Sequence, residues 1–169
     1  MIHRALHWLK SSLVVAMASL SLGRAALSQC PELNPPAKSA LALHVYATGV
    51  QIYRWNDTSW VFVAPEATLF ADADGTHKVG THSAGPSWSS DSGGTVVGAV
   101  LKRCTPDSTA VPWLSLAATP SDGAGVFRGV TFIQRTRTVG GVAPAAPGSG
   151  AGEVVRVPYR AEYFFYRTM

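Results

Sequence analysis

The sequence has 169 residues with 14 Lys and Arg against 10 Asp and Glu, and only 14% of its residues are charged. Arg4, Lys10 and Arg24 fall in an N-terminal segment with the pattern of a cleaved leader, and without them 11 basic residues face 10 acidic ones. A chain this close to neutral excludes a nucleic-acid partner recruited by charge, and its length predicts a single ordinary domain.

Residues 1–28 have the parts of a secretory signal peptide: a basic start, an apolar run over Leu13–Leu22, and small residues at Ala26 and Ser28. We expect cleavage before Gln29 and a secreted or periplasmic protein. The apolar run is shorter than the roughly 20 residues that span a bilayer. No other stretch is long enough, so we expect no transmembrane segment.

The two cysteines, Cys30 and Cys104, leave three alternatives open. In an oxidising compartment they could form a disulfide, which would stabilise the fold by about 4–5 kcal/mol in the chain-entropy description. Cys30 would be the second residue after cleavage, where chains fray, so it could also stay unpaired. Lipid attachment at Cys30 is the third alternative, and Gln29 disfavours it because a lipoprotein signal has a small residue there.

After a proline-containing lead-in over residues 29–40, residues 41–169 are expected to form one β domain. Thr48-Gly49 predicts a turn between two strands, and Asn56-Asp57 predicts a hairpin turn. The other expected strands cover 59–63, 68–71, short pieces around Val79 and Trp88, 95–103, 113–118, 127–138 and the C-terminal segment. About nine short strands, with no helical period outside the leader, predict an all-β antiparallel sandwich or barrel.

The C-terminal strand has the clearest pattern in the chain. From Val155 to Phe165 every second residue is apolar or aromatic, and the residues between them as far as Tyr163 are Pro158 and the charged Arg156, Arg160 and Glu162. Strand side chains point alternately to two faces, so this pattern predicts a half-buried strand. Pro158 has no N–H donor and predicts an edge position or a bulge.

Three C-terminal segments are distinctive: residues 130–135, residues 138–144 (Thr-Val-Gly-Gly-Val-Ala-Pro) and residues 157–166 (Val-Pro-Tyr-Arg-Ala-Glu-Tyr-Phe-Phe-Tyr). With upstream segments at 51–53, 64–70, 80–88 and 111–114, they resemble the secreted proteins catalogued as domain of unknown function 3455. The resemblance covers nearly all of the chain from about Leu41 onward. It implies a secreted or periplasmic β-rich domain without an established activity.

The resemblance also bears on the cysteines. Usual members of that family have one cysteine near the position of Trp55 and another near Gly148–Gly150, and both are missing here. Their joint absence implies that those two cysteines pair elsewhere in the family. This chain is expected to do without that bridge.

Three of the matching segments supply a candidate binding site, made of His82, Trp88, Trp113, Gln134 and Arg135. Aromatic rings beside an amide and a guanidinium are the groups that a carbohydrate- or small-molecule-binding face uses. The same tryptophans could instead pack in the core. We expect a cell-envelope or extracellular binding and interaction module, with a glycan or small molecule as the candidate ligand.

The alternative function is a hydrolytic or metal-dependent enzyme centred on His82 with Asp72 or Asp74. Asp72, Asp74, His77 and His82 form the one metal-like cluster, but their spacing matches no zinc motif and lacks the glutamate of a calcium loop. Asp91-Ser92-Gly93-Gly94 resembles a serine-protease nucleophile loop and is more simply a turn. No glycine-rich dinucleotide motif is present. We therefore expect no catalytic residue, metal or cofactor.

Overall fold

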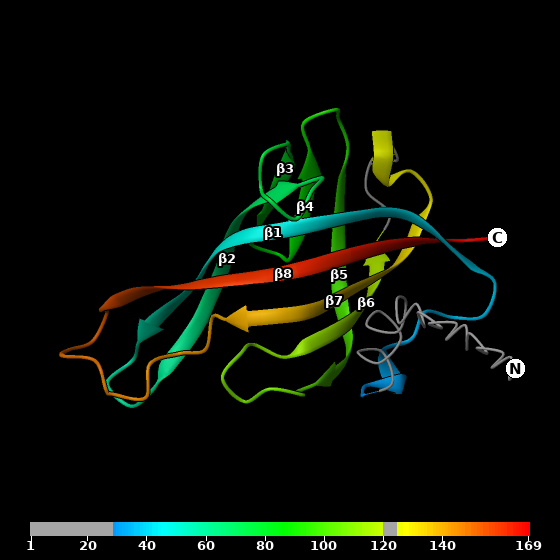
Figure 1. The fold of residues 1–169 in the computed structure, drawn as a ribbon. Helices are drawn as coiled ribbons and strands as arrows, with labels where there is room; N and C mark the ends of the chain where they lie inside the picture. Colours follow the sequence, from blue (N-terminus) through cyan, green and yellow to red (C-terminus); the bar gives the residue numbers. More distant parts are fainter. Residues whose placement is uncertain (1–28, 120–124) are drawn as a thin grey trace, which may run out of the picture.

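A computed structural model describes residues 29–119 and 125–169, and the expected leader over residues 1–28 lies outside them. The described chain consists of strands with two short 3₁₀ helices (Figure 1). The elements are η1 (Pro31–Leu33), β1 (Ser39–Trp55), β2 (Trp60–Phe70), β3 (Lys78–Ser83), β4 (Ser87–Ser90), β5 (Thr95–Cys104), β6 (Trp113–Thr119), η2 (Gly125–Phe127), β7 (Val130–Gly140) and β8 (Val154–Thr168). Within these two ranges, helices of a length and hydrophobicity suited to crossing a membrane are absent.

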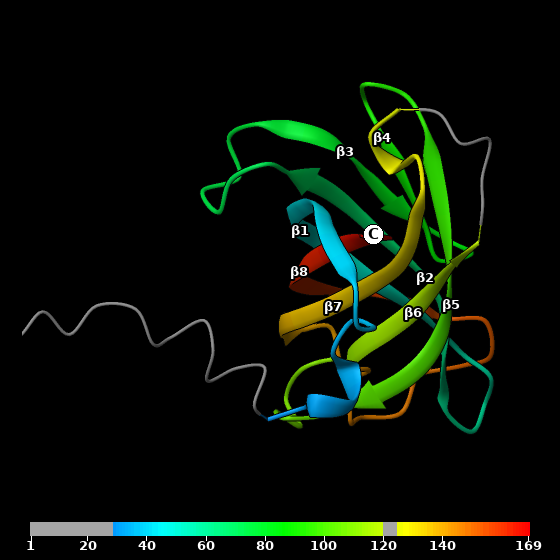
Figure 2. The same ribbon diagram turned by 90° about the vertical axis from the view of Figure 1, so that its right-hand side faces the viewer.

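The eight strands form one antiparallel sheet that closes into a barrel. Each strand pairs with its neighbour in the sequence, and β1 closes the ring by pairing with β8 from Ser39↔Thr168 to Arg54↔Val154. Figures 1 and 2 show β1 and β8 lying side by side along the long direction of the barrel. Closure gives each strand of the ring two neighbours, although the Val154–Pro158 part of β8 pairs with β1 alone. The all-β prediction is confirmed, and of its two forms the barrel is the observed one.

The described residues form eight strands, close to the roughly nine that were expected, and several of them are longer than the short strands expected from the sequence. The turn expected at Thr48-Gly49 does not form, because β1 runs straight through it while paired with both neighbours. A Cβ on Gly49 would lie 2.1 Å from the carbonyl oxygen of Glu66. Gly49 is therefore explained by the close approach of β2 and not by a turn. Likewise, the pieces expected at 59–63 and 68–71 belong to one strand, β2.

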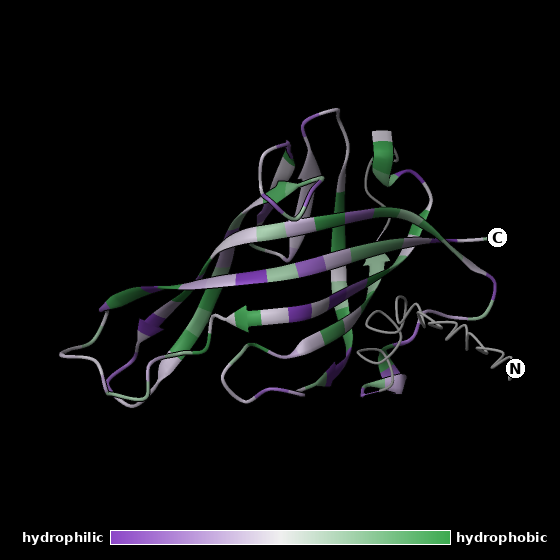
Figure 3. Ribbon diagram, viewed as in Figure 1, coloured by the Kyte–Doolittle hydropathy of each residue, from purple (hydrophilic) through white to green (hydrophobic). Residues whose placement is uncertain are grey.

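β8 shows the alternation read from the sequence, visible in Figure 3 as hydrophilic and hydrophobic bands along the strand. Tyr159, Ala161, Tyr163 and Phe165 are buried, while the residues between them are more exposed. Pairing of β8 with β7 begins at Tyr159. Pro158, one residue earlier, pairs with β1 and has no strand on its β7 side. A residue without an N–H donor fits there.

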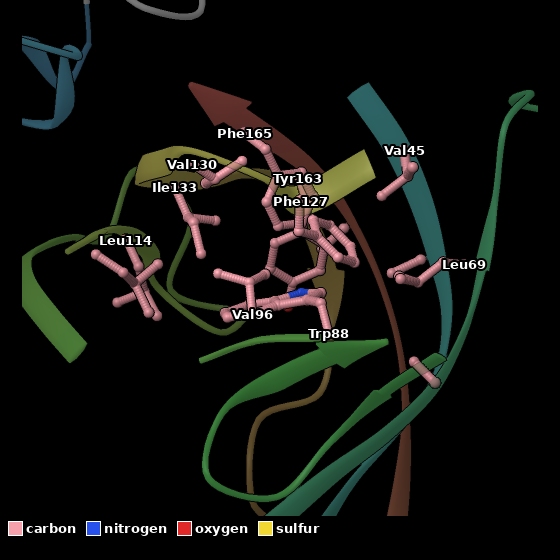
Figure 4. Packing of buried hydrophobic residues seen from close by; sticks show 14 of the residues in the cluster. Val45, Leu69, Trp88, Val96, Leu114, Phe127, Val130, Ile133, Tyr163 and Phe165 are labelled. Atoms are coloured by element: carbon pink, nitrogen blue, oxygen red, sulfur yellow. The ribbon is translucent and has the colours of Figure 1, made fainter. Parts of the chain in front are cut away.

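The barrel interior holds a continuous hydrophobic core (Figure 4). At its centre, Trp88 of β4 packs edge-to-face against Tyr163 and Phe165, with ring centroids 5.3 and 5.8 Å away. Phe127 of η2 packs on Phe165 from one end, at 5.0 Å between centroids. Aromatic contacts of this kind add to the stabilisation from apolar burial. Side chains therefore fill most of this end of the barrel and leave a small pocket of about 150 Å³ beside Phe127.

The lead-in packs on the outside of the barrel against β5 and β6, where Figure 2 shows η1. A disulfide joins Cys30 to Cys104 of β5. Leu33 and Trp113 bury their side chains beside it, and the Leu33 carbonyl accepts a hydrogen bond from Gln134 Nε2. These five residues form a second, smaller core, which we call the lead-in core.

The 141–153 loop packs on the β1–β2 hairpin. The backbone N–H of Trp55 donates to the Glu153 carbonyl, and the Trp55 carbonyl accepts from the N–H of Gly152. A Cβ on Gly148 would lie 2.5 Å from Trp55 Cγ. Trp55 and Gly148, at the two positions where the family resemblance implies a disulfide, are thus in contact here. Backbone hydrogen bonds and the packing of the Trp55 indole on the loop take the place of that bond.

Candidate functional site

A cavity of about 460 Å³ occupies the end of the barrel where the β1–β2, β3–β4 and β5–β6 loops lie. Its size falls within the range of small-molecule sites. Apolar side chains make up most of its wall, and a few polar ones converge on it. The described lining residues are Gln51, Tyr53, Phe62, Val63, Pro65, His82, Gly85, Pro86, Val100, Arg103, Val111, Pro112, Leu114 and Arg135.

Arg135 is the charged side chain that β7 turns into the barrel. Ile133 lies in the core, so Arg135, two residues later, falls on the same inward face, whereas Gln134 lies on the outer face. Nε and Nη2 of Arg135 donate to the Pro112 carbonyl at 3.1 and 2.8 Å. This double contact fixes the guanidinium at the cavity wall. Its remaining N–H groups stay available to other partners.

His82 contributes a neutral imidazole to the cavity wall. Its Nδ1 donates to the Ser87 carbonyl at 2.8 Å, and its ring stacks on Trp88 with centroids 4.5 Å apart. Burial lowers the pKa of His82 to about 4, and the charge of Arg135 acts in the same direction, while the bond to Ser87 opposes them. Near pH 7 the ring is uncharged, and Nε2 is an acceptor.

Three neighbouring buried side chains, Gln51 on the cavity wall and Tyr159 and Tyr163 in the core, each have a polar atom without a well-formed hydrogen bond in the described chain. These atoms are Gln51 Nε2 and the two phenol oxygens, and Gln51 itself lines the cavity. Burial raises the pKa of Tyr159, and the Tyr163 hydroxyl beside it adds to the rise. Leaving such a group unpaired costs about 1–3 kcal/mol. A bound molecule that offers partners would remove that cost.

The structure divides the five sequence-predicted binding residues between two faces of the barrel. His82 and Arg135 line the cavity, and Trp88 lies directly behind His82 without lining it. Trp113 and Gln134 lie on the outer face, in the lead-in core. Both tryptophans are buried, so neither offers the open stacking surface that we expected from the sequence.

Sequence reasoning missed Gln51 and Tyr53, two residues of β1 that line the cavity. Gln51 is buried, Tyr53 donates its hydroxyl to the Gly141 carbonyl at 2.7 Å, and both line the cavity. The signal was present in the strand period: both residues fall in register with Val45, an inward-facing residue of the same strand. A polar residue in an inward position was the clue.

The residues of the enzyme hypothesis do not assemble around His82. Asp72 instead pairs with the exposed His77 at 2.7 Å in the β2–β3 turn and accepts from the backbone N–H of Thr76. The Thr76 bond, helped by His77, holds the pKa of Asp72 below its usual range. No hydrogen bond in the described chain joins His82 to Asp72 or Asp74. Asp72 and His77 therefore belong to a hydrogen-bonded turn, whereas His82 lies on the cavity wall and has no hydrogen bond to them.

The described ranges contain one group of three potential metal ligands, Cys30, Glu32 and Cys104, with ligand atoms within 4.8 Å of one another. Its two sulfurs are bonded to each other, so they offer no thiolate to a metal.

The loop between β4 and β5 contains the sequence Asp91-Ser92-Gly93-Gly94, which resembles a serine-protease nucleophile loop. Ser92 Oγ makes a hydrogen bond with the hydroxyl of Ser90. Its geometry is that of a turn.

His82 gives the barrel a testable pH dependence. Its pKa is about 4 when folded and about 6.5 when unfolded, so between these values the unfolded chain binds a proton that the folded chain does not. Stability should therefore fall as the pH drops from 6.5 to 4, by on the order of 3 kcal/mol from this residue. Urea unfolding over this pH range should show the slope, and His82→Gln should flatten it. An equal slope in the variant would contradict a buried neutral imidazole.

Together these features define a class of protein: a small antiparallel β-barrel, packed at one end and hollowed at the other by a cavity of apolar, aromatic and cationic side chains. The chain belongs to the family described as Protein of unknown function (DUF3455), whose model matches residues 35–167. The match confirms the resemblance drawn from the sequence motifs. No curated protein and no solved structure matches the chain.

Proposed function

We propose that this protein is an exported binding module of the cell envelope or extracellular space that holds a small molecule in the barrel cavity. The observation that carries the proposal is the cavity of about 460 Å³ at one end of the barrel, which is about three times as large as the pocket of about 150 Å³ beside Phe127 at the other end. Protein interiors rarely leave voids much larger than a water molecule, whereas ligand sites have this volume and this mixed lining. The apolar wall favours a small organic molecule over a glycan, whose many hydroxyls need polar partners.

The rim of the cavity supports access from solvent. Phe62, Val63 and Val100 line the cavity and yet keep 50%, 47% and 39% of their surface exposed. Exposed apolar side chains gathered around a hollow are typical of ligand-binding grooves. A ligand that covers them would gain about 25 cal/mol for each Å² of apolar surface removed from water. We therefore expect binding to be driven largely by apolar burial.

Export is supported by two independent features of the chain. The first is the leader pattern in residues 1–28. The second is the Cys30–Cys104 disulfide, because such bonds persist mainly in oxidising compartments. N-terminal sequencing of the full chain after expression in a secreting host tests this part. A first residue of Gln29 is expected, and an intact precursor held in the cytosol would contradict it.

A tryptophan placed on the rim provides the test of cavity binding. Val100→Trp puts a large ring where Val100 lines the cavity, while Leu101→Trp puts the same ring on the next residue of β5, which is exposed and does not line it. Nile red, a neutral fluorophore that brightens in apolar sites, would be titrated into each variant, together with a thermal-shift screen of a metabolite library.

We expect Val100→Trp to weaken binding of Nile red and of library hits by about tenfold or more, and Leu101→Trp to change it by less than about threefold. Both variants should keep the circular dichroism of the parent chain. Equal affinities in all three proteins would overturn the proposal, because the bound molecules would then lie outside the cavity.

A further inference from the structure

The charges around the cavity are of one sign. Arg103 and Arg135 are its charged lining residues, and none of the described lining residues is Asp or Glu. The ion pairs of the described chain involve other cations and lie elsewhere on the barrel. His82 adds no charge near neutral pH. The cavity is therefore cationic, although the chain without its leader is nearly neutral.

The polarity of the cavity also changes with depth. Phe62, Val63 and the exposed Arg103 lie at its rim, whereas Gln51 and His82 are each only 2% exposed. The interior therefore offers hydrogen-bond donors and acceptors beneath a collar of apolar side chains. A ligand that satisfies both regions has a polar group at one end and an apolar body at the other.

Arg135 has the geometry to meet an anionic group. The Pro112 carbonyl accepts from Nε and Nη2, which leaves Nη1 and the second N–H of Nη2 free of that contact. The guanidinium is planar and cannot lose its proton, so its free N–H groups suit the two oxygens of a carboxylate. Gln51 Nε2 is a buried donor beside the Tyr159 hydroxyl and makes no well-formed hydrogen bond in the described chain, so it is a second candidate contact on the same cavity.

We propose that the ligand is a small organic acid whose carboxylate binds Arg135 and Gln51 and whose apolar body extends along the cavity wall toward Phe62 and Val100. This inference rests on the proposed function, since it names the class of ligand for the same cavity. A carboxylate fits better than a phosphate monoester, because Arg103 is exposed at the rim and Arg135 is the one guanidinium held at the cavity wall, where it and neutral donors balance a single negative charge. A dianion would leave one charge desolvated without a partner.

The experiment compares four probes that share an eight-carbon chain: octanoate, 1-octanol, octylamine and octyl phosphate. Each would displace Nile red from the full mature chain at pH 7, and isothermal titration would give the affinity. We expect octanoate to bind about 10- to 100-fold more tightly than 1-octanol, the range that hydrogen bonds to a charged group provide. Octylamine should bind more weakly than 1-octanol, and octyl phosphate more weakly than octanoate.

Three variants locate the carboxylate. Arg135→Gln and Gln51→Leu should each bring the affinity for octanoate close to that for 1-octanol. Arg160→Gln removes a charge from the outward face of β8 and should leave the preference for octanoate unchanged. Gln51→Leu matters because it leaves the Arg135–Pro112 contact intact. A loss of preference in both cavity variants therefore cannot come from misplacing the β5–β6 loop.

The outcomes separate this inference from the proposed function. Equal binding of octanoate and 1-octanol, with both blocked by Val100→Trp, would leave cavity binding standing and overturn the carboxylate assignment. Stronger binding of octyl phosphate than of octanoate would also overturn it. A preference for octanoate that survives in Arg135→Gln would place the anion elsewhere. Failure of all four probes to displace Nile red would overturn the organic-acid assignment, whereas cavity binding is overturned only if Val100→Trp leaves the affinity for Nile red unchanged.

Discussion

Replacing Cys30 and Cys104 together by serine is expected to lower the free energy of unfolding by about 4–5 kcal/mol in the chain-entropy description. The bond closes a loop with a sequence separation of 74 and so restricts the unfolded chain strongly. It also holds the lead-in core in place, so its loss would let Leu33 and Trp113 become exposed. Such a loss is a large part of the 5–15 kcal/mol that stabilises a typical domain.

Urea unfolding of the double variant, compared with the parent chain with and without a reducing agent, measures this effect. The reduced parent should match the double variant, and the reducing agent should leave the double variant unchanged. Gln134→Leu is a useful companion, because it removes the hydrogen bond to Leu33 while keeping the disulfide. A double variant within about 1 kcal/mol of the oxidised parent would show that the lead-in adds little to stability.

Much of the fold could be predicted from the strand period. The alternation on β8 identified the inward residues from Tyr159 to Phe165, and the turn at Asn56 joins β1 to β2 as expected. Gly49 was misread because a glycine inside a strand and a glycine in a turn look alike in sequence. Only the distance to Glu66 on the next strand separates the two cases. Closure of the ring by β1 and β8 joins distant segments, and no local pattern encodes it.

The candidate site was predicted only in part, for a related reason. Gln134 and Arg135 were grouped because they are adjacent, yet neighbours in a strand face opposite sides, and the barrel separates them completely. Gln51 was overlooked because a polar residue inside an apolar alternation resembles an ordinary interruption. Its position becomes informative once the ring shows which face is enclosed, and that depends on non-local pairing.

Trp88→Ala is expected to cost about 3–5 kcal/mol of stability, the range for deleting a buried aromatic side chain. Trp88 is 1% exposed and contacts His82, Tyr163 and Phe165 at the centre of the barrel. Weaker ligand binding in this variant would therefore reflect unfolding and not the loss of a direct contact, since Trp88 does not line the cavity. Trp88→Phe should lose less, because it also removes the indole N–H, a buried donor without a partner.

Gly98 provides the control that ties the effect to packing. A Cβ on Gly98 would lie 3.0 Å from both Leu116 Cδ2 and Trp88 Cζ3, and because the end of a leucine side chain can shift more easily than an indole, Gly98→Ala should destabilise the parent chain mainly through Trp88. In the Trp88→Ala background the indole is gone, and the added methyl group enters the space that it leaves. The two substitutions should therefore combine with a favourable coupling free energy of about 1 kcal/mol or more in a double-mutant cycle from urea unfolding. Simple additivity would mean that the barrel relaxes around the missing ring, and that Trp88 is not the packed centre of this protein.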